Sequence, residues 1–480
     1  MSGLKSGLRV WARTLSACAS DLSDVRRLCG LWNDFAAEDD AVQIKRYDID
    51  DDAALDALKQ GIVERALAGG ADDAPRRTTV RSIIDAVRRE GDEAVAELTE
   101  RFDGVRLEAS QFEVTREELD RAADTLDPKL TAILQRAHDN IRAFHSKHLR
   151  ESWEESFEDG TIIGQRVTPI ESAGVYVPGG KAFYPSSVLM NIVPARVAGV
   201  KEIIMVSPPT CNGDIHPGVL AAARIAGATR VFRVGGAQAV AALAYGTATI
   251  PPVCKITGPG NAYVTMAKAL VRQAVEIDSE AGPSEVVVIA DAEADPRFVA
   301  YELLAQAEHD EEAMPVLITT SAELAGTVQE YVAEQAPGLD RATIVRQSLE
   351  SCGAVVVVRS MDEAVDLTNL IAPEHLSIQV KIPTRVAAKI TNAGAIMIGP
   401  MTPVAVGDYY AGPNHILPTM RRARFSSPLT AEDFRKVTSV LYYTRQRLRA
   451  QADDIIELAT LEGLQAHARS VAVRVQEDFK

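Results

Sequence analysis

Two segments contain side chains that could bind a cation or move a proton. Leu303–Asp310 ends a helical pattern and places Gln306 and His309 three residues apart, so that both face the same side. Imidazole nitrogen is a common zinc ligand and an amide oxygen a rarer one. A lone pair of this type is more often found on a helix surface, so the segment does not establish a metal site by itself.

In the second segment, Glu374 and His375 follow Pro373 and directly precede a strand candidate. Proline keeps its predecessor out of the helical conformation, so the pair is expected in a loop that feeds the strand. Histidine titrates near neutral pH and burial can tune a glutamate toward it, so the pair is suited to proton transfer. A loop salt bridge is the alternative interpretation.

Carboxylates and imidazoles also occur together nearer the C-terminus. Residues 406–415 are rich in glycine, are not expected to form a helix, and contain Asp408 and His415 as candidate ligands or substrate contacts. The last predicted helix contains Glu462 and His467. Taken alone, these two would be helix-surface residues.

Glycine-rich loops follow two strand candidates and precede helices, at Tyr176–Gly180 and Gly258–Asn261. Backbone amides at a helix N-terminus can bind a phosphate group. The segment Gly235–Gln238 is similar, but none of the three completes a GxGxxG motif with a downstream acidic residue. The spacing predicts phosphate binding and does not by itself predict NAD.

Composition excludes several classes of protein. The net charge of −16 argues against a nucleic-acid-binding protein, which would carry a basic face. Five cysteines without a CxxC motif make a disulfide framework improbable. No apolar run reaches the roughly 18 residues of a membrane span. Residues 1–20 are basic and serine-rich like a transit peptide, but a plain extension is the favoured interpretation. We therefore predict a cytoplasmic protein, with organelle targeting left open.

The elements that must position these residues alternate between strand and helix from residue 172 onward. Such alternation predicts parallel sheets covered on both faces. The strands are too many for one small unit, so we predict two α/β lobes. The strand candidates are 174–177, 202–206, 231–234, 254–257, 285–290, 315–319, 354–358, 376–380 and 395–398. Residues 1–70 carry no strand signal, 76–150 are helical in pattern, and 430–480 are purely helical in pattern.

Taken together, the segments resemble the histidinol dehydrogenase family over roughly residues 45–475. The blocks that carry the resemblance are GVYVPGGKAFYPSSVLMNIVPARVAGV, GGAQAVAALAYGT, KITGPGNAYV, IDSEAGPSEVVVIADA, LLAQAEHD, APEHL and GDYYAGPNHILPT. No single block is specific, but all of them occur in order.

The resemblance implies a zinc-dependent, NAD-linked dehydrogenase that carries out the last steps of histidine biosynthesis. L-Histidinol would be oxidised through bound L-histidinaldehyde to L-histidine with two NAD, and Glu374 and His375 would be the catalytic residues. The resemblance implies one zinc per subunit, held by Gln306, His309, Asp408 and His467. It implies NAD contacts by Tyr176, Gln238 and Asn261. It implies substrate contacts by Ser284, Gln306, His309, His375, Asp408, His415, Glu462 and His467.

The resemblance also implies a fold of two incomplete Rossmann-like lobes, similar in shape to aldehyde dehydrogenases, with helical N- and C-terminal tails. A homodimer is expected, in which the C-terminal tail completes the partner's active site. The expected parts are an N-terminal extension (1–43), a helical tail (44–75), a first lobe (76–175 with 285–428), a second lobe (176–284) and a C-terminal helical tail (429–480).

Two stretches depart from the family pattern. The extension at 1–43 is longer than the family needs, and residues 420–428 are poorer in glycine than expected. The second stretch neighbours the substrate region, so an alternative function stays open. It is a related NAD-dependent dehydrogenase that oxidises another hydroxymethyl compound, such as a sulfonated diol. A catalytically silent scaffold protein is disfavoured because every expected site position is occupied.

Overall fold

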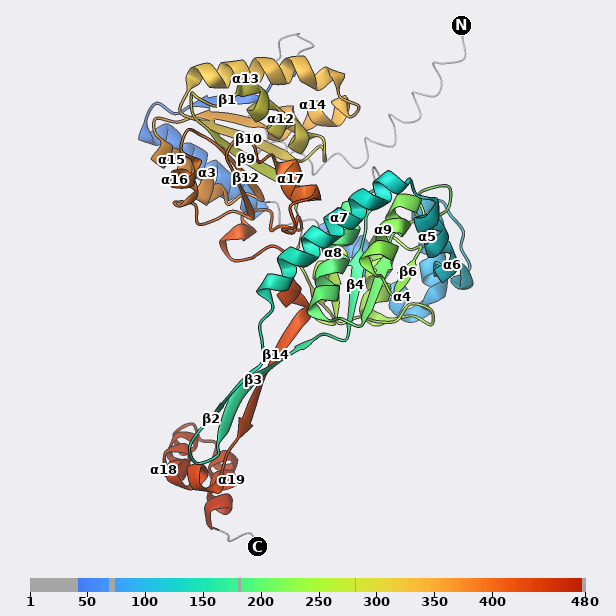
Figure 1. The fold of residues 1–480 in the computed structure, drawn as a ribbon, viewed down its shortest axis with the longest axis vertical. Helices are drawn as coiled ribbons and strands as arrows, with labels where there is room; N and C mark the ends of the chain where they lie inside the picture. Colours follow the sequence, from blue (N-terminus) through green and yellow to red (C-terminus); the bar gives the residue numbers. More distant parts are fainter. Residues whose placement is uncertain (1–41, 69–73, 180–182, 281, 477–480) are drawn as a thin grey trace. The chain divides into compact units, whose positions relative to one another are not determined.

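The strands of this protein form two parallel sheets and one antiparallel sheet (Figure 1). The computed structural model describes residues 42–68, 74–179, 183–280 and 282–476, so most of the expected extension at 1–43 lies outside the described residues. The chain divides into two units, Met1–Val42 and Gln43–Lys480, and the fold below is that of the second unit.

The first sheet has six parallel strands. Their order is β1 (Lys45–Asp48), β11 (Ala354–Val357), β10 (Met314–Thr319), β9 (Glu285–Ala290), β12 (His375–Gln379) and β13 (Ala395–Ile398). Val287 and Ile289 of β9 face a core shared with α3 (Asp52–Ala68), α15 (Met361–Ile371) and α16 (Pro383–Ala387). The other face is covered by α12 (Pro296–Ala307), α13 (Ala322–Gln335) and α14 (Ala342–Cys352) (Figure 1).

The second sheet has five parallel strands in the order β6 (Arg230–Phe232), β5 (Glu202–Val206), β4 (Ser172–Tyr176), β7 (Lys255–Thr257) and β8 (Glu276–Ile277). Alternate residues of β5 belong to two different cores, as the pleat of a strand requires. Ile203 and Met205 pack with α6 (Arg116–Thr125), α7 (Pro128–His145), α8 (Pro185–Ala198) and α9 (Pro217–Ala226). Ile204 and Val206 pack with α4 (Ala74–Glu90), α5 (Asp92–Asp103), α10 (Gly236–Tyr245) and α11 (Ala262–Val271).

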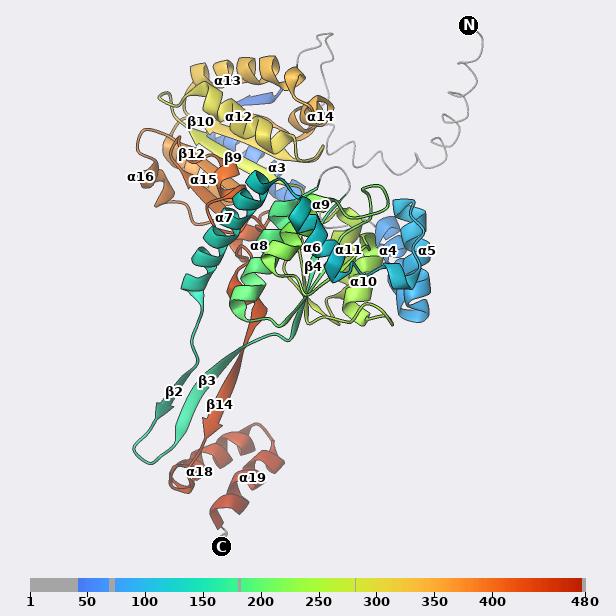
Figure 2. The same cartoon turned by 45° about the vertical axis from the view of Figure 1, so that its right-hand side comes forward.

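The third sheet is antiparallel and leads to the C-terminal helices (Figure 2). It pairs β3 (Ile162–Pro169) with β2 (Trp153–Ser156) and with β14 (Arg435–Tyr442), after which come α18 (Arg445–Leu461) and α19 (Gln465–Gln476). The remaining short helices are η2 (Ala109–Gln111), η3 (Ser146–His148), η4 (Ala336–Gly338), α17 (Val404–Tyr409), η5 (Arg422–Arg424) and η6 (Ala431–Phe434).

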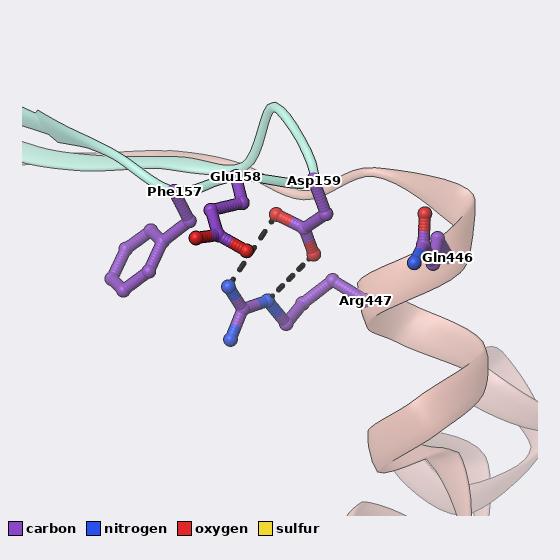
Figure 3. Close-up of a pocket in the computed structure, with 5 residues that line it drawn as sticks. All are labelled: Phe157, Glu158, Asp159, Gln446 and Arg447. Carbon is purple, nitrogen blue, oxygen red and sulfur yellow. Dashed lines mark hydrogen bonds and ion pairs between the residues drawn. The ribbon is translucent and has the colours of Figure 1, made fainter.

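An ion pair fixes the start of α18 on the turn between β2 and β3 (Figure 3). Arg447 Nε donates to Asp159 Oδ2 at 2.8 Å, and the guanidinium lies 4.5 Å from the centre of the Phe157 ring. A pocket opens at this junction, lined by Phe157, Glu158, Asp159, Gln446 and Arg447 (Figure 3). It contains none of the predicted site residues.

The prediction of an α/β fold with two parallel-sheet lobes is confirmed. All nine predicted strands are present within two residues of their expected ends. The expectation of no strand before residue 70 was wrong, because Lys45–Asp48 forms the edge strand β1. The expectation that 430–480 is purely helical was wrong as well, because β14 occupies Arg435–Tyr442. The expectation that 406–415 forms no helix was wrong for its first four residues, because α17 extends over Val404–Tyr409. The likeness to aldehyde dehydrogenases stays a prediction.

The grouping of the N-terminal helices differs from the expected one. Residues 76–175 were expected in the first lobe, but α4 to α7 pack on the second sheet. The expected tail at 44–75 instead adds β1 and α3 to the first sheet. An amphipathic pattern shows which face of a helix is buried but not which sheet covers it. None of the described helices is long and apolar enough to cross a lipid bilayer.

Candidate active site

The predicted catalytic residues meet at the amino-terminal edge of the first sheet. His375 is the first residue of β12 and pairs in register with Val286 at the start of the neighbouring β9. Parallel strands require the connecting helix to run back toward the edge where the next strand begins. The C-terminal end of α12, with Gln306 and the following His309, therefore returns to this edge.

The backbone of Glu285 fixes the Glu374–His375 pair. Its carbonyl oxygen lies 3.1 Å from His375 Nδ1, and its N–H donates to Glu374 Oε2 at 2.8 Å. Because a carbonyl oxygen can only accept, Nδ1 must carry the proton of this hydrogen bond. His375 Nε2 lies 3.3 Å from Asp408 Oδ1. Glu374 and His375 are 7% and 5% exposed, so bulk water has little access to either side chain.

The charges in this cluster stabilise one another. Burial lowers the pKa of His375, but Glu374 and Asp408 outweigh burial and raise that pKa well above its ordinary value. Burial raises the pKa of Asp408, yet His375, followed by His415 and His309, holds it below its usual value. Asp408 is therefore ionised at neutral pH and beside three imidazoles.

Gln306 and His309 lie on the same side of the lobe as Asp408. Gln306 is 2% exposed, and its amide nitrogen has no hydrogen-bond partner among the described residues. His309 is exposed, and its charge contributes to the lowered pKa of Asp408. Within the described ranges, no group of three or more His, Cys, Asp or Glu side chains is placed to hold a metal ion. The predicted ligand set differs from such a group because it includes an amide and a residue of α19.

Ser284 and His415 lie beside this cluster. Ser284 directly precedes β9, and its carbonyl accepts from the Met314 N–H at 2.9 Å. His415 Nδ1 donates to the backbone carbonyl of Asp408 at 3.0 Å, and Nε2 lies 3.4 Å from Ser187 Oγ on α8. Burial lowers the pKa of His415, so this imidazole is neutral at pH 7. His415 thus connects Asp408 to a helix of the second lobe.

The structure does not bring the two tail residues to this cluster. Glu462 follows α18, His467 lies in the first turn of α19, and both side chains are exposed. In the described part of the chain, no hydrogen bond or ion pair joins either residue to Gln306, His309 or Asp408. Among the predicted metal ligands of one chain, the described interactions connect His309 with Asp408 through their charges and show no side-chain contact of either with Gln306.

The predicted NAD residues lie at the carboxyl edge of the second sheet. The strand order reverses between β4 and β7, and such a reversal marks the usual ligand crevice of an open α/β sheet. Tyr176 ends β4, and its hydroxyl oxygen accepts from the N–H of Gly236 at 3.1 Å. Gly258 has φ +112° and lies so close to the Tyr176 carbonyl that a Cβ would overlap it. Only glycine fits there.

Gln238 and Asn261 lie at the starts of two helices, α10 and α11, that begin at this edge of the sheet. Gln238 is fully buried on α10, and neither atom of its amide has a partner among the described residues. The Asn261 side-chain oxygen accepts from the N–H groups of Tyr263 and Val264, so this residue caps α11. Its amide nitrogen makes no hydrogen bond within the described ranges.

Sequence reasoning missed several residues that support the site. Glu302 is buried on α12 one turn before Gln306, and its Oε2 accepts from the Val404 N–H at 3.1 Å. Burial raises the pKa of Glu302 to about 6. Its position could have been noticed in the sequence, because a carboxylate four residues before Gln306 lies on the same helix face. Lys268 and Asp278 hold Gly258 in the loop after β7, and no spacing in the sequence identifies them.

A two-lobed parallel α/β fold with a buried Glu–His pair suits proton transfer coupled to redox chemistry, and this protein is an oxidoreductase enzyme. Its sequence matches the family model described as histidinol dehydrogenase over residues 69–475. The chain belongs to the histidinol dehydrogenase family.

Named relatives cover nearly the whole chain. Histidinol dehydrogenase of Heliobacterium mobile is 51% identical over 406 residues, which are 85% of this chain and 95% of that protein. Histidinol dehydrogenase of Bacillus subtilis is 48% identical over 412 residues, or 86% and 96% of the two chains. The crystal structure of histidinol dehydrogenase from Elizabethkingia anophelis aligns with a TM-score of 0.83 and 32% identity, covering 92% of this chain and 99% of that chain.

Proposed function

We propose that this protein is a zinc-dependent enzyme that oxidises L-histidinol through bound L-histidinaldehyde to L-histidine with two NAD. The observation that carries the proposal is the buried Glu374–His375 pair, fixed by one backbone residue and adjacent to the ionised Asp408. The names of relatives about half identical to this chain support histidinol as the substrate.

The residues at the edge of the first sheet fit a zinc ion. Asp408 offers a carboxylate, His309 an imidazole and Gln306 an amide, and zinc accepts all three donor types. The buried side chain of Gln306 makes no hydrogen bond among the described residues, so it is available as a ligand. In the second lobe, the buried amide of Gln238 and the amide nitrogen of Asn261 are similarly available to NAD. When bound, zinc would anchor the imidazole and amine of the substrate, and NAD would accept hydride.

His375 is the proposed base for the alcohol step. Its Nδ1 proton is held by the Glu285 carbonyl, so Nε2 is the nitrogen that would take the hydroxyl proton. Because Glu374 and Asp408 raise the pKa of His375, Nε2 must first lose the proton that it directs at Asp408, and binding of Asp408 to zinc would favour that loss. Glu374 is the proposed base for hydration of the aldehyde. Its Oε2 is held by the Glu285 N–H, which leaves Oε1 to take a proton from water. Two bases in one site allow two different oxidations at one pH.

The C-terminal tail is proposed to complete the site of a second subunit. Glu462 and His467 are exposed and make no contact with the site of their own chain among the described hydrogen bonds and ion pairs. Large apolar side chains are also exposed on β14, α18, α19 and the turn between the two helices, and such surfaces usually contact another protein. They are Val437, Leu441, Tyr442, Leu458, Leu461, Leu464 and Val473. In the proposed homodimer, His467 of the partner subunit is the fourth zinc ligand.

A substrate comparison tests the proposal. Purified protein is expected to contain about one zinc per subunit and to form NADH with L-histidinol. Hydroxymethyl compounds without an imidazole, including a sulfonated diol, serve as competitors. A higher kcat/KM for the sulfonated diol would support the related dehydrogenase instead. A cytoplasmic location stays a prediction.

A further inference from the structure

Two buried side chains of opposite charge hold both backbone groups of Gly258. Lys268 Nζ, on α11, donates to the Gly258 carbonyl oxygen at 2.9 Å. Asp278, directly after β8, accepts from the Gly258 N–H through Oδ2 at 2.7 Å. Lys268 and Asp278 also form an ion pair with each other, and their side chains are only 2% and 4% exposed.

This pair holds a glycine that lies where the strand order of the second sheet reverses. Gly258 begins the Gly258–Asn261 loop at the strand reversal and lies against the Tyr176 carbonyl with φ +112°. A free glycine samples many conformations, so something must hold it in this one. Burying an ion pair is a poor way to gain stability, because both charges lose their hydration. The pair is better explained by its effect on the Gly258–Asn261 loop, whose conformation it fixes.

We propose that Lys268 and Asp278 are positioning residues for NAD, which preorganise the Gly258–Asn261 loop. This inference rests on the proposed use of NAD. The pair acts through the loop backbone, because both charged groups are engaged with Gly258 and with each other. A loop that is already ordered does not have to be ordered on binding, so the dinucleotide binds more tightly.

Substitution of Lys268 is expected to weaken the binding of NAD without affecting zinc or L-histidinol. Lys268→Met removes the charge and leaves Gly258 unrestrained, so the Kd for NAD should rise at least about tenfold. Zinc content and the KM for L-histidinol depend on the first lobe and should stay within about twofold of wild type. The Kd is measured by calorimetric titration of the whole protein with NAD.

Lys255→Met is the matched control. Lys255 lies on β7, is 9% exposed, and donates through Nζ to the backbone carbonyl of Asp433 at 2.7 Å. It is thus another buried lysine that binds a backbone carbonyl, but at the opposite end of the strand from Gly258. This variant should lose stability without a change in the Kd for NAD.

Asp278→Asn provides a second test. Asparagine keeps an oxygen for the Gly258 N–H but loses the charge, so its effect on the Kd should be intermediate. If Lys268→Met does not fold, the Kd of the Asp278→Asn variant for NAD decides whether the inference holds. The inference is overturned if every folded variant of the pair binds NAD within twofold of wild type. It is equally overturned if Lys255→Met weakens NAD binding as much as Lys268→Met. Failure of the wild-type protein to bind NAD would instead contradict the proposed function itself.

Discussion

The carbonyl oxygen of Glu285 lies 3.1 Å from His375 Nδ1, which commits that nitrogen as a donor and leaves Nε2 for chemistry. The N–H of Glu285 engages Glu374 in the same way. The two proposed bases are therefore held by the two ends of one peptide segment on the neighbouring strand. This arrangement separates their roles, because the backbone fixes one atom of each base. The remaining atoms are His375 Nε2, which lies 3.3 Å from Asp408 Oδ1, and Glu374 Oε1.

His375→Ala and Glu374→Gln should impair different half-reactions. Loss of the imidazole should slow oxidation of the alcohol by about 10²–10⁴-fold, the usual contribution of a general base. Loss of the carboxylate should mainly slow oxidation of the aldehyde. Single-turnover measurements of NADH formation, started either from L-histidinol or from L-histidinaldehyde, separate the two steps. Equal losses from both starting compounds in both variants would contradict the division of roles.

Glu302 should support Asp408 through the short helix α17. This helix begins after Pro403, which has no side-chain cap, and the buried carboxylate of Glu302 binds the first N–H at Val404 instead. Glu302→Leu leaves that N–H buried without an acceptor and should lower the free energy of unfolding by about 1–3 kcal/mol. It should also reduce zinc content, because α17 carries Asp408.

Glu302→Gln is the control for this prediction, since its amide oxygen can still accept from Val404. It should retain zinc and lose less than about 1 kcal/mol in urea denaturation. If the leucine and glutamine variants lose zinc to the same extent, the cap at Val404 is not what holds Asp408.

Asp103→Asn should stabilise the protein at neutral and higher pH but not at acidic pH. Burial raises the pKa of Asp103 from 3.8 to about 6, and its Oδ2 has no hydrogen-bond partner among the described residues. Between these pKa values the folded state binds more protons than the unfolded state, so this carboxyl lowers stability as the pH rises through that window. The neutral asparagine removes the penalty. The gain should be on the order of 1 kcal/mol at about pH 8, because the site is only partly buried.

Urea denaturation of Asp103→Asn and wild type at about pH 4 and pH 8 measures this difference. Little or no gain is expected at the lower pH, where wild-type Asp103 is largely protonated in the folded state. An equal gain at both values would mean that the buried charge is not the cause.

Mixed dimers should reveal whether the tail acts between subunits. His375→Ala and His467→Ala proteins should each be inactive alone. In a symmetric dimer with exchanged tails, a mixed pair contains one site with both histidines intact, so random mixing should restore about a quarter of wild-type activity. The proteins are mixed after unfolding and refolding together. A mixture as inactive as its components would show that His467 serves its own chain.

Much of the fold could be predicted because strands such as Glu285–Ala290 are continuous apolar runs that only a sheet buried on both faces accommodates. The strand Arg435–Tyr442 escaped prediction because most of its side chains are exposed on both faces. Its pairing with Ile162–Pro169 depends on residues about 270 positions away in the sequence.

The chemistry of the candidate site could be predicted from the sequence, but the residues that hold its side chains in place could not. Glu374 and His375 are adjacent in the sequence, so their association was visible. The role of Glu285 depends on the register between β9 and β12, which no local pattern encodes. The same holds for Asp278, whose contact with Gly258 bridges two loops of the second sheet.

The central claim is that one site carries out two successive oxidations on a substrate that stays bound. The most direct measurement is the amount of NADH formed per L-histidinol consumed by the zinc-loaded protein, with product identified at the end. We expect two NADH per L-histidinol and L-histidine as the product. One NADH, with aldehyde accumulating in solution, would contradict it.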